Sequence, residues 1–254
     1  MFEFIRVSLT LAMLVYASLR DLREREVPDM TWIIFGLTGL IIDLYEVYNG
    51  RLALLGLGFT LLASTAITFL IGYLGLFGGA DFKALVVLSL LQPYPPRVFK
   101  PHLGMVSGIY PLTVLSNSAL LGASSALFQA FRNLYAAYRG SRLFEGLGHE
   151  SSWRKLMVLI SGSKMNLNSI RGPPFHYPLE TMEEGVRRLL SPFRMDDDEA
   201  LKVFEEFRRA GASEIWISNT LPFIVFIMLG YLTSIFLGDI ALSLLFNAMS
   251  LIQA

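Results

Sequence analysis

The chain has 254 residues, of which 54% are hydrophobic and only 17% are charged, and its mean hydropathy is +0.53. Soluble domains carry about 25% charged residues, so the apolar excess predicts surfaces that contact a lipid bilayer. The 21 basic and 21 acidic residues cancel, and this balance argues against a nucleic-acid partner. The chain has no cysteine and only three scattered histidines, so we expect neither thiol catalysis nor a metal or other cofactor.

Seven apolar segments follow one another along the chain. They are residues 4–19, 30–44, 52–77, 82–91, 102–131, 221–237 and 240–252. Because a helix of about 20 residues crosses a bilayer, this pattern predicts an all-α polytopic membrane protein with about six transmembrane helices. A seventh span fits if Asp239 lies at a turn, and segment 82–91 is too short to span alone.

The charged residues gather in one stretch. Residues 139–218 hold 24 of them in 80 positions, against 18 in the other 174. We therefore expect residues 1–138 to form five membrane helices, 139–218 a small soluble α+β insert, and 219–254 the last helix with a C-terminal tail. Within the insert we expect strands at 153–160 and 214–218, a loop at 162–178, a capping box at Thr181 and Glu184, and a helix capped by Asp196–Asp198 that ends at Gly211.

The short loops predict an orientation. The loop 20–29, Lys83 and the exit from the fifth segment together carry seven basic residues, whereas the opposite loops carry four. Basic residues favour the cytoplasmic side, so we expect loop 20–29 and the insert to lie in the cytoplasm of a multi-pass protein of the cell membrane. In the fifth segment, Asn117 is expected to hydrogen-bond to another helix.

Asp21 lies at the cytoplasmic end of the first segment. It continues a helical stripe with Leu14 and Ala17, which is the stripe expected to pack inside the bundle. An ionised carboxylate costs about 2.5–3.5 kcal/mol or more at mid-bilayer, so such groups usually face the bundle interior or a wet cavity. The structural alternative is a charged connecting loop in which Asp21 pairs with Arg25.

Asp81 lies at the start of the fourth segment, directly after Gly78, Gly79 and Ala80. Glycine permits positive φ angles and the close approach of another chain, so this turn could expose the carboxylate to an extended peptide. The structural alternative is a Gly-Gly turn followed by Asp81 as the N-cap of a helix that begins at Phe82.

Asp21 and Asp81 together suggest acid–base chemistry. Two carboxylates within hydrogen-bonding distance cannot both ionise easily, so they share a proton. One can take a proton from an attacking water while the other protonates the peptide carbonyl or leaving nitrogen. The same residues could instead be ion sites of a proton- or ion-coupled transporter, although they lie at one face and we find no inverted repeat. A non-catalytic assembly partner of a secretion machine is a third hypothesis.

Two motifs resemble the prepilin-peptidase group of GxGD membrane aspartic proteases, and most closely its archaeal preflagellin peptidase branch. They are Asp21 followed by Pro28-Asp29, and Gly78-Gly79-Ala80-Asp81-x-Lys83. Ala80 departs from the glycine of the bacterial members, and the chain has no four-cysteine loop. Further agreement lies in residues 111–115 and 221–223, and in Asn117, Trp216 and Gly230.

The resemblance implies an aspartic endopeptidase with Asp21 and Asp81 as the catalytic pair and Gly78, Gly79 and Ala80 as an active-site loop. It implies removal of the short basic leader from preflagellins and pilin-like precursors at the cytoplasmic face, just before their apolar helix. The absence of the cysteine loop implies cleavage without N-methylation of the new terminus.

Overall fold

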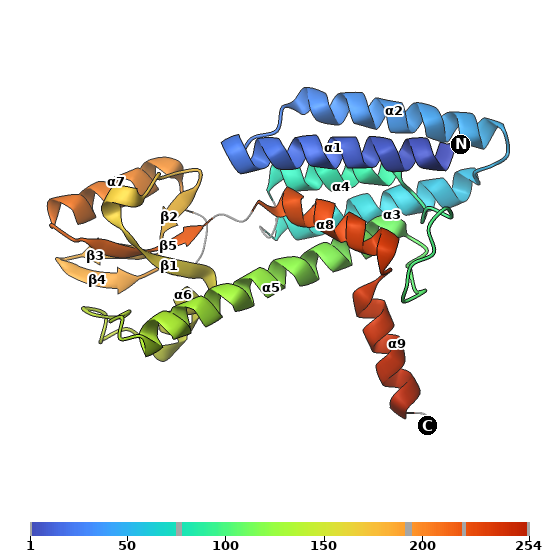
Figure 1. Cartoon of the computed structure of the whole chain (residues 1–254). Coiled ribbons are helices and arrows are strands. Elements are labelled where there is room, and N and C mark those ends of the chain that lie inside the picture. Colours follow the sequence, from blue (N-terminus) through green and yellow to red (C-terminus); the bar gives the residue numbers. More distant parts are fainter. Residues whose placement is uncertain (1, 75–77, 191–194, 220–221, 253–254) are drawn as a thin grey trace. The chain divides into compact units, whose positions relative to one another are not determined.

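The computed structural model describes residues 2–74, 78–190, 195–219 and 222–252. The chain forms two compact units, Met1–Gly122 with Pro222–Ala254 (the membrane unit) and Ala123–Leu221 (the insert unit). Helix α5 (Tyr110–Tyr138) begins in the first unit and continues into the second (Figure 1).

The described part of the membrane unit contains helices and connecting loops but no strand. Helices α1, α2, α3 and α5 are long and apolar enough to cross a membrane, and α8 with α9, bent by 50° at their break, can count as a fifth span. These helices confirm the all-α polytopic fold with a sheet-containing insert, while α4 has 13 residues and is shorter than a full crossing. Besides α5, the unit contains α1 (Phe2–Glu24), α2 (Asp29–Tyr48), α3 (Leu54–Tyr73), α4 (Gly79–Leu91), α8 (Phe223–Phe236) and α9 (Ile240–Ile252).

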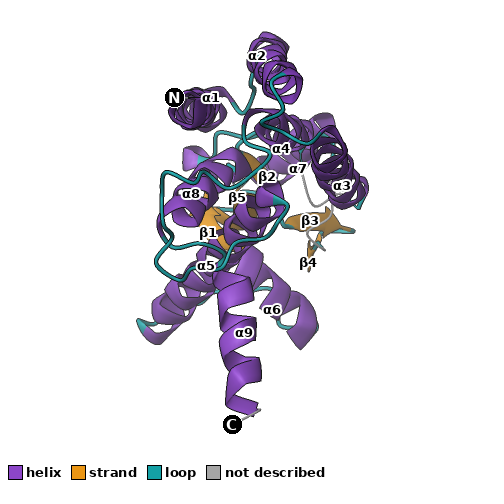
Figure 2. Ribbon diagram, turned by 90° about the vertical axis from the view of Figure 1, so that its right-hand side faces the viewer, coloured by secondary structure: helices purple, strands orange, loops and turns teal. Residues whose placement is uncertain are grey.

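Helix α4 is the central helix of this unit. It packs against α1, α2, α3 and α8, which surround it when the bundle is viewed nearly along its helices (Figure 2). Its side chains at Leu85, Leu88 and Leu91 are almost fully buried, together with Met13 and Leu14 of α1. Because every neighbour contacts α4, the position of its first turn is set by the whole bundle.

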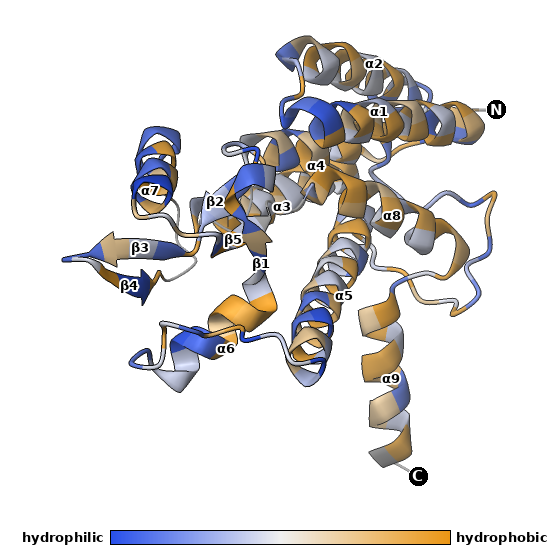
Figure 3. Ribbon diagram, turned by 60° about the vertical axis from the view of Figure 1, so that its left-hand side comes forward, coloured by the Kyte–Doolittle hydropathy of each residue, from blue (hydrophilic) through white to orange (hydrophobic). Residues whose placement is uncertain are grey.

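The outward faces of α2 and α3 carry large apolar side chains, and those of α2 give this helix much of its orange colour in Figure 3. Ile34 and Ile41 of α2 and Leu55 and Leu62 of α3 are each more than half exposed. Isolated in water such faces would be unfavourable, but hydrocarbon contact makes them favourable. The pattern is that of a bundle whose surface meets lipid.

The break between α8 and α9 is held by polar contacts. Asn117 of α5 donates its amide to the carbonyl of Gly238 at 2.8 Å and accepts from the N–H of Ile240 at 3.1 Å. Asp239 accepts from the N–H of Leu242 at 3.0 Å, so it caps the start of α9. The expected interhelical role of Asn117 is confirmed, and these bonds satisfy backbone groups that a helix break leaves free.

Gly230 lets α8 and α5 approach closely. A β-carbon at this position would lie 2.2 Å from Ser118 Oγ and 2.7 Å from the Val114 carbonyl oxygen. No side chain fits there without moving one helix, which is the usual reason for a small residue at a membrane helix contact.

The insert unit combines a three-stranded antiparallel sheet in the order β1-β5-β2 with a separate β3–β4 hairpin. The predicted strand at 214–218 is confirmed as part of β5, whereas the predicted strand at 153–160 is wrong because this segment is α6. Its apolar residues have helical periodicity, and Ser151 caps it by accepting from the Arg154 N–H. The elements are α6 (Ser152–Ser161), β1 (Gly162–Asn166), the 3₁₀ turn η1 (Leu167–Ser169), β2 (His176–Pro178), β3 (Glu180–Glu183), β4 (Val186–Leu189), α7 (Asp197–Arg209) and β5 (Glu214–Asn219).

Two further sequence predictions for the insert are corrected. The segment 162–178, expected to be a loop, contributes β1 and β2 through pairing with β5, a long-range contact that local sequence does not reveal. The supposed capping box at Thr181 and Glu184 belongs to the β3–β4 hairpin, where Glu184 adopts a φ of 51° in the turn. The helix capped at Asp196 is confirmed as α7, and Gly211 follows its end with a φ of +69°.

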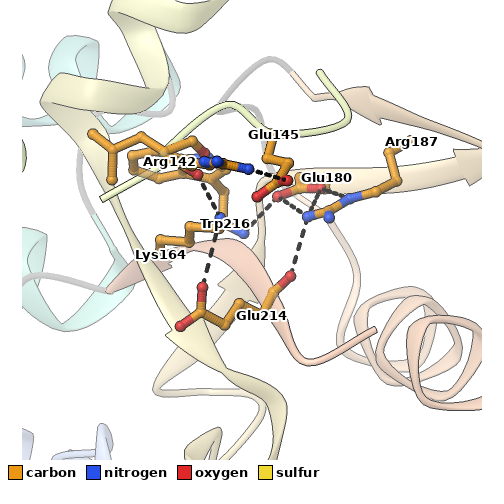
Figure 4. A network of polar contacts seen from close by, with 8 residues as sticks. Arg142, Glu145, Lys164, Glu180, Arg187, Glu214 and Trp216 are labelled. Carbon is orange, nitrogen blue, oxygen red and sulfur yellow. Dashed lines mark hydrogen bonds and ion pairs between the residues drawn. The ribbon is translucent and has the colours of Figure 1, made fainter. Parts of the chain in front are cut away.

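A buried ion pair holds the hairpin to the sheet (Figure 4). Glu180 is fully buried, and Arg187 donates to both of its carboxylate oxygens at 2.8 and 3.0 Å. The Trp216 N–H donates to the same carboxylate at 2.7 Å, and the Trp216 indole donates to the Leu143 carbonyl at 3.1 Å. Burial raises the pKa of Glu180, and the positive charge of Arg187 offsets part of that rise.

We expect the Glu150→Gln substitution to destabilise the insert unit in a pH-dependent way. Glu150 accepts from the Leu189 N–H and from Arg154, each at 3.1 Å. Burial alone would raise the pKa of Glu150, but these bonds outweigh it and hold the pKa below its ordinary value of 4.5. The carboxylate therefore stabilises the fold above pH 4.5, and this contribution is lost as the pH falls through the folded-state pKa.

Hydrogen exchange of the full chain, followed by mass spectrometry over β4 and α6, measures this effect. Near neutral pH the free energy of local opening should be about 1–3 kcal/mol lower in the variant than in the wild type, and this difference should shrink under acid conditions. An effect that is the same at both pH values would contradict the assigned pKa direction. Glu145→Gln is a suitable control because its side chain is exposed.

Candidate functional site

Asp21 lies in the last turn of α1. The helix continues past the apolar segment to Glu24, so the interpretation of Asp21 as a loop residue is wrong. Leu14 and Ala17, on the same stripe, are fully buried, while the Asp21 side chain is half-buried. The charge of Arg25 acts on Asp21, and the Arg25 N–H bonds to the Asp21 carbonyl at 3.1 Å as the helix ends.

Asp81 lies in the first turn of α4. The helix begins at Gly79, so Asp81 is its third residue and Gly78, not Asp81, occupies the N-cap position. The Gly78 N–H donates to Asp81 Oδ2 at 2.9 Å. An acidic side chain at the third helical position commonly accepts such a bond from the N-cap backbone. The bond fixes the carboxylate over the start of the helix.

The small residues before Asp81 leave room beside its carboxylate, and their backbone conformation is ordinary. Gly78 has a φ of −76°, and Gly79 and Ala80 belong to the helix, so the positive φ angle that glycine permits is not used here. A β-carbon at Gly78 would lie 3.2 Å from Asp81 Oδ2, whereas one at Gly79 would meet no atom of the described residues within 4 Å, its chain neighbours aside. Both glycines are exposed, so the backbone beside the carboxylate is accessible.

The two carboxylates lie at the same end of the membrane unit. Helices α1 and α4 pack together, and the end of α1 lies near the start of α4 (Figure 1). The negative charge of Asp21 acts on Asp81, although no hydrogen bond joins their carboxylates in the described part of the chain. A shared proton therefore requires a closer approach of the two carboxylates.

A salt bridge connects the two motifs. Lys83, in the first turn of α4, donates to Asp29 Oδ1 at 2.5 Å, and Asp29 is the first residue of α2. Because Asp29 follows Asp21 by one short connection, the bridge links the segments that carry the two carboxylates. The motif pattern contained both residues, but their contact could not be read from spacing alone.

A second ionic cluster occupies the opposite end of the same helices. Arg6 of α1 donates to Asp43 Oδ1 at 2.6 Å and to Glu46 Oε2 at 2.8 Å, both on α2. It also donates to the carbonyls of Leu90 and Leu91 at the end of α4, at 3.2 and 2.9 Å. Sequence analysis missed this cluster, although a charged residue within an apolar segment signals a buried partner.

Among the residues that the structure describes, no three His, Asp or Glu side chains lie close enough together to hold a metal ion.

Comparison with protein families finds two models along the chain. The model described as "Type IV leader peptidase family" matches residues 8–127, which include Asp21 and Asp81. The model described as "Archaeal Peptidase A24 C-terminus Type II" matches residues 154–240, which cover most of the insert unit and α8.

Curated relatives agree with the family models. The chain is 25% identical over 236 residues to the preflagellin peptidase of Methanococcus maripaludis, covering 89% of this chain and 92% of the relative. It is also 25% identical to the preflagellin peptidases of Methanocaldococcus jannaschii, with 89% and 91% covered, and Methanococcus voltae, with 91% and 94% covered. The apolar helices, the two carboxylates at one bundle end and these matches lead to one conclusion: the chain is a protease that is similar to the type IV leader peptidase family over residues 8–127 and to the archaeal peptidase C-terminus model over residues 154–240.

Proposed function

We propose that this protein is an aspartic endopeptidase that removes the short basic leader from preflagellins and from pilin-like precursors. The proposal is supported by the preflagellin peptidases it resembles along most of their length. The single observation that carries it is the placement of Asp21 and Asp81 at one end of two packed helices, within electrostatic reach of each other.

In the proposed mechanism Asp21 and Asp81 share one proton. The ionised carboxylate takes a proton from water as the water oxygen attacks the peptide carbonyl carbon. The protonated carboxyl gives its proton to the carbonyl oxygen, which forms a diol intermediate. As this intermediate collapses, the carboxyl that took the water proton gives it to the leaving nitrogen, and a hydroxyl of the intermediate gives its proton to the other carboxylate. The proton returns to the pair at each turnover, so the two residues act as one unit.

The exposed start of α4 suits an extended substrate. Among the described residues outside its own chain neighbours, no atom lies within 4 Å of a β-carbon built at Gly79, which suits the approach of a peptide backbone. The Gly78 N–H keeps Asp81 oriented while the peptide is bound. We propose that this end of the bundle faces the cytoplasm, as the basic residues of loop 20–29 favour, and that the new N-terminus is left unmethylated.

Incubation of the purified full chain with a preflagellin tests the proposal. Mass spectrometry of the product should show one cut that releases the leader and an unmethylated new terminus, even when S-adenosylmethionine is present. An uncleaved precursor would contradict the assigned activity, and a methylated product would contradict the absence of methyl transfer.

We expect the Lys83→Met substitution to slow cleavage by roughly twofold to fivefold. The Lys83–Asp29 pair is largely exposed, so its interaction is worth about 0.2–1 kcal/mol. The loss should appear in kcat rather than in KM, because the bridge orients the helix start and does not contact the bound peptide.

Charge reversal provides the control. Asp29→Lys and Lys83→Asp should each slow cleavage, and the double variant Asp29→Lys/Lys83→Asp should recover most of the rate. If the double variant is as slow as the product of the single effects, the bridge does not position Asp81.

A further inference from the structure

A polar cavity of about 420 Å³ lies at the end of the membrane unit opposite Asp21 and Asp81. Its walls come from the start of α1, the end of α2, the connection to α3 and the segment after α4. These are the points at which apolar helices end, which in a bilayer is the level of the lipid headgroups.

Two guanidinium groups in this cavity have no carboxylate partner among the described residues. They belong to Arg51 and Arg97, both exposed, and Arg51 stacks over the Phe2 ring at 5.9 Å. The third arginine of the cavity, Arg6, is already engaged by Asp43 and Glu46. The lining also holds two acids, Glu3 and Glu46, of which Glu46 pairs with Arg6. Arg51 and Arg97 are the uncommitted cations of the cavity, and such a pairing suits a phosphate group.

The cavity also contains a buried acceptor that lacks a donor. Gln92 is 3% exposed, and its amide nitrogen donates to the Tyr94 carbonyl at 2.7 Å. Its Oε1 is buried and has no hydrogen-bond partner within the described ranges. A buried amide oxygen without a donor is unfavourable by about 1–3 kcal/mol, so its presence points to a ligand group that carries an N–H or O–H.

We propose that this cavity binds the phosphodiester headgroup of a membrane lipid. The phosphate lies between Arg51 and Arg97, and the terminal ammonium or hydroxyl of the headgroup donates to Gln92 Oε1. The acyl chains run beside the exposed apolar residues Leu54 and Leu55, which begin α3 directly after this wall. The site is independent of the peptidase site and would persist if the cleavage activity were disproved.

Lipid binding to the purified full chain tests the site. Affinity is measured by native mass spectrometry in detergent for short-chain phosphatidylethanolamine and phosphatidylcholine, which differ in the hydrogen-bond donors of their headgroups. Arg51→Gln/Arg97→Gln should weaken the binding of both lipids at least about tenfold, whereas Lys100→Gln, an exposed residue outside the cavity lining, should change neither.

The Gln92→Leu variant tests the contact between the headgroup donor and Gln92 Oε1 separately from the phosphate contact. It should lower the affinity for phosphatidylethanolamine to that for phosphatidylcholine, because choline has no N–H to donate, and it should leave phosphatidylcholine binding unchanged. Inorganic phosphate and glycerophosphoethanolamine, which lack acyl chains, should bind far more weakly than either lipid.

Three outcomes would overturn the proposal. Unchanged lipid binding in Arg51→Gln/Arg97→Gln would exclude the phosphate contact. An equal loss for both lipids in Gln92→Leu would exclude the donor contact. Binding of inorganic phosphate as tight as that of the lipids would assign the cavity to a soluble anion instead.

Discussion

Asp21→Asn and Asp81→Asn are each expected to lower the rate of leader cleavage by about 10²–10⁴-fold or more, to the level of an uncleaved control. Asparagine keeps the size of the side chain but cannot exchange a proton with water. In the proposed mechanism the two carboxylates share one proton, so loss of either should be about as damaging as loss of both. The double variant Asp21→Asn/Asp81→Asn should therefore be no slower than the single variants.

The assay is the gel shift of a preflagellin co-expressed with each variant, with membrane insertion checked by fractionation. Glu26→Gln is the matched control, since Glu26 is an exposed acid in the connection that follows Asp21, and this change should leave cleavage unaltered. Retained processing in either aspartate variant would contradict the two-carboxylate mechanism.

Arg6→Met is expected to destabilise the membrane unit by about 3–5 kcal/mol. Arg6 is the residue that pairs with Asp43, whose side chain is fully buried, and that also caps the carbonyls of Leu90 and Leu91. Removing the guanidinium leaves a buried carboxylate without a counter-charge, which is far less favourable than removing a surface ion pair.

The midpoint of thermal unfolding in detergent micelles measures this loss. Arg6→Met/Asp43→Asn should recover part of the stability, because the second change removes the unpaired charge. Arg23→Met serves as control on the same helix, since Arg23 is exposed. If Arg6→Met unfolds at the wild-type temperature, the buried pair does not hold α1, α2 and α4 together.

Apolar segments and local chemical patterns were sufficient to predict the helical membrane fold. The stripe through Leu14, Ala17 and Asp21 correctly predicted which side of α1 is buried, and Asp196 correctly predicted the start of α7. Both depend on residues within one or two helical turns, where periodicity and capping are decisive.

Contacts between distant segments could not be predicted in the same way. The segment 162–178 is polar and rich in turn residues, yet it forms β1 and β2 because β5 supplies their hydrogen bonds. Arg6 was one of the four basic residues counted on the opposite side, and its pairing was missed because its partners, Asp43 and Glu46, are about 40 positions away. For the same reason, the motif residues Asp29 and Lys83 gave no sign of their salt bridge.

For the candidate site, too, residue identities could be predicted from the sequence, whereas contacts between helices could not. The identities of Asp21 and Asp81 came from residue type and resemblance, whereas their placement at one bundle end depends on the packing of α1 against α4. Of the two properties expected of the glycines, the positive φ is not observed, because Gly78 caps α4 with an ordinary negative φ. The absence of a side chain at Gly78 does leave room beside Asp81.

Cross-linking between positions 21 and 81 tests most directly whether the two carboxylates meet. The chain has no native cysteine, so Asp21→Cys/Asp81→Cys carries the only two thiols. Asp29→Cys/Lys83→Cys is the positive control for a known contact, and Asp21→Cys/Glu46→Cys, whose positions lie at opposite ends of the bundle, is the negative control. With a short bis-thiol reagent in native membranes, we predict that the 21–81 pair is joined as efficiently as the 29–83 pair. A 21–81 yield no higher than that of the 21–46 pair would show that Asp21 and Asp81 do not share a site.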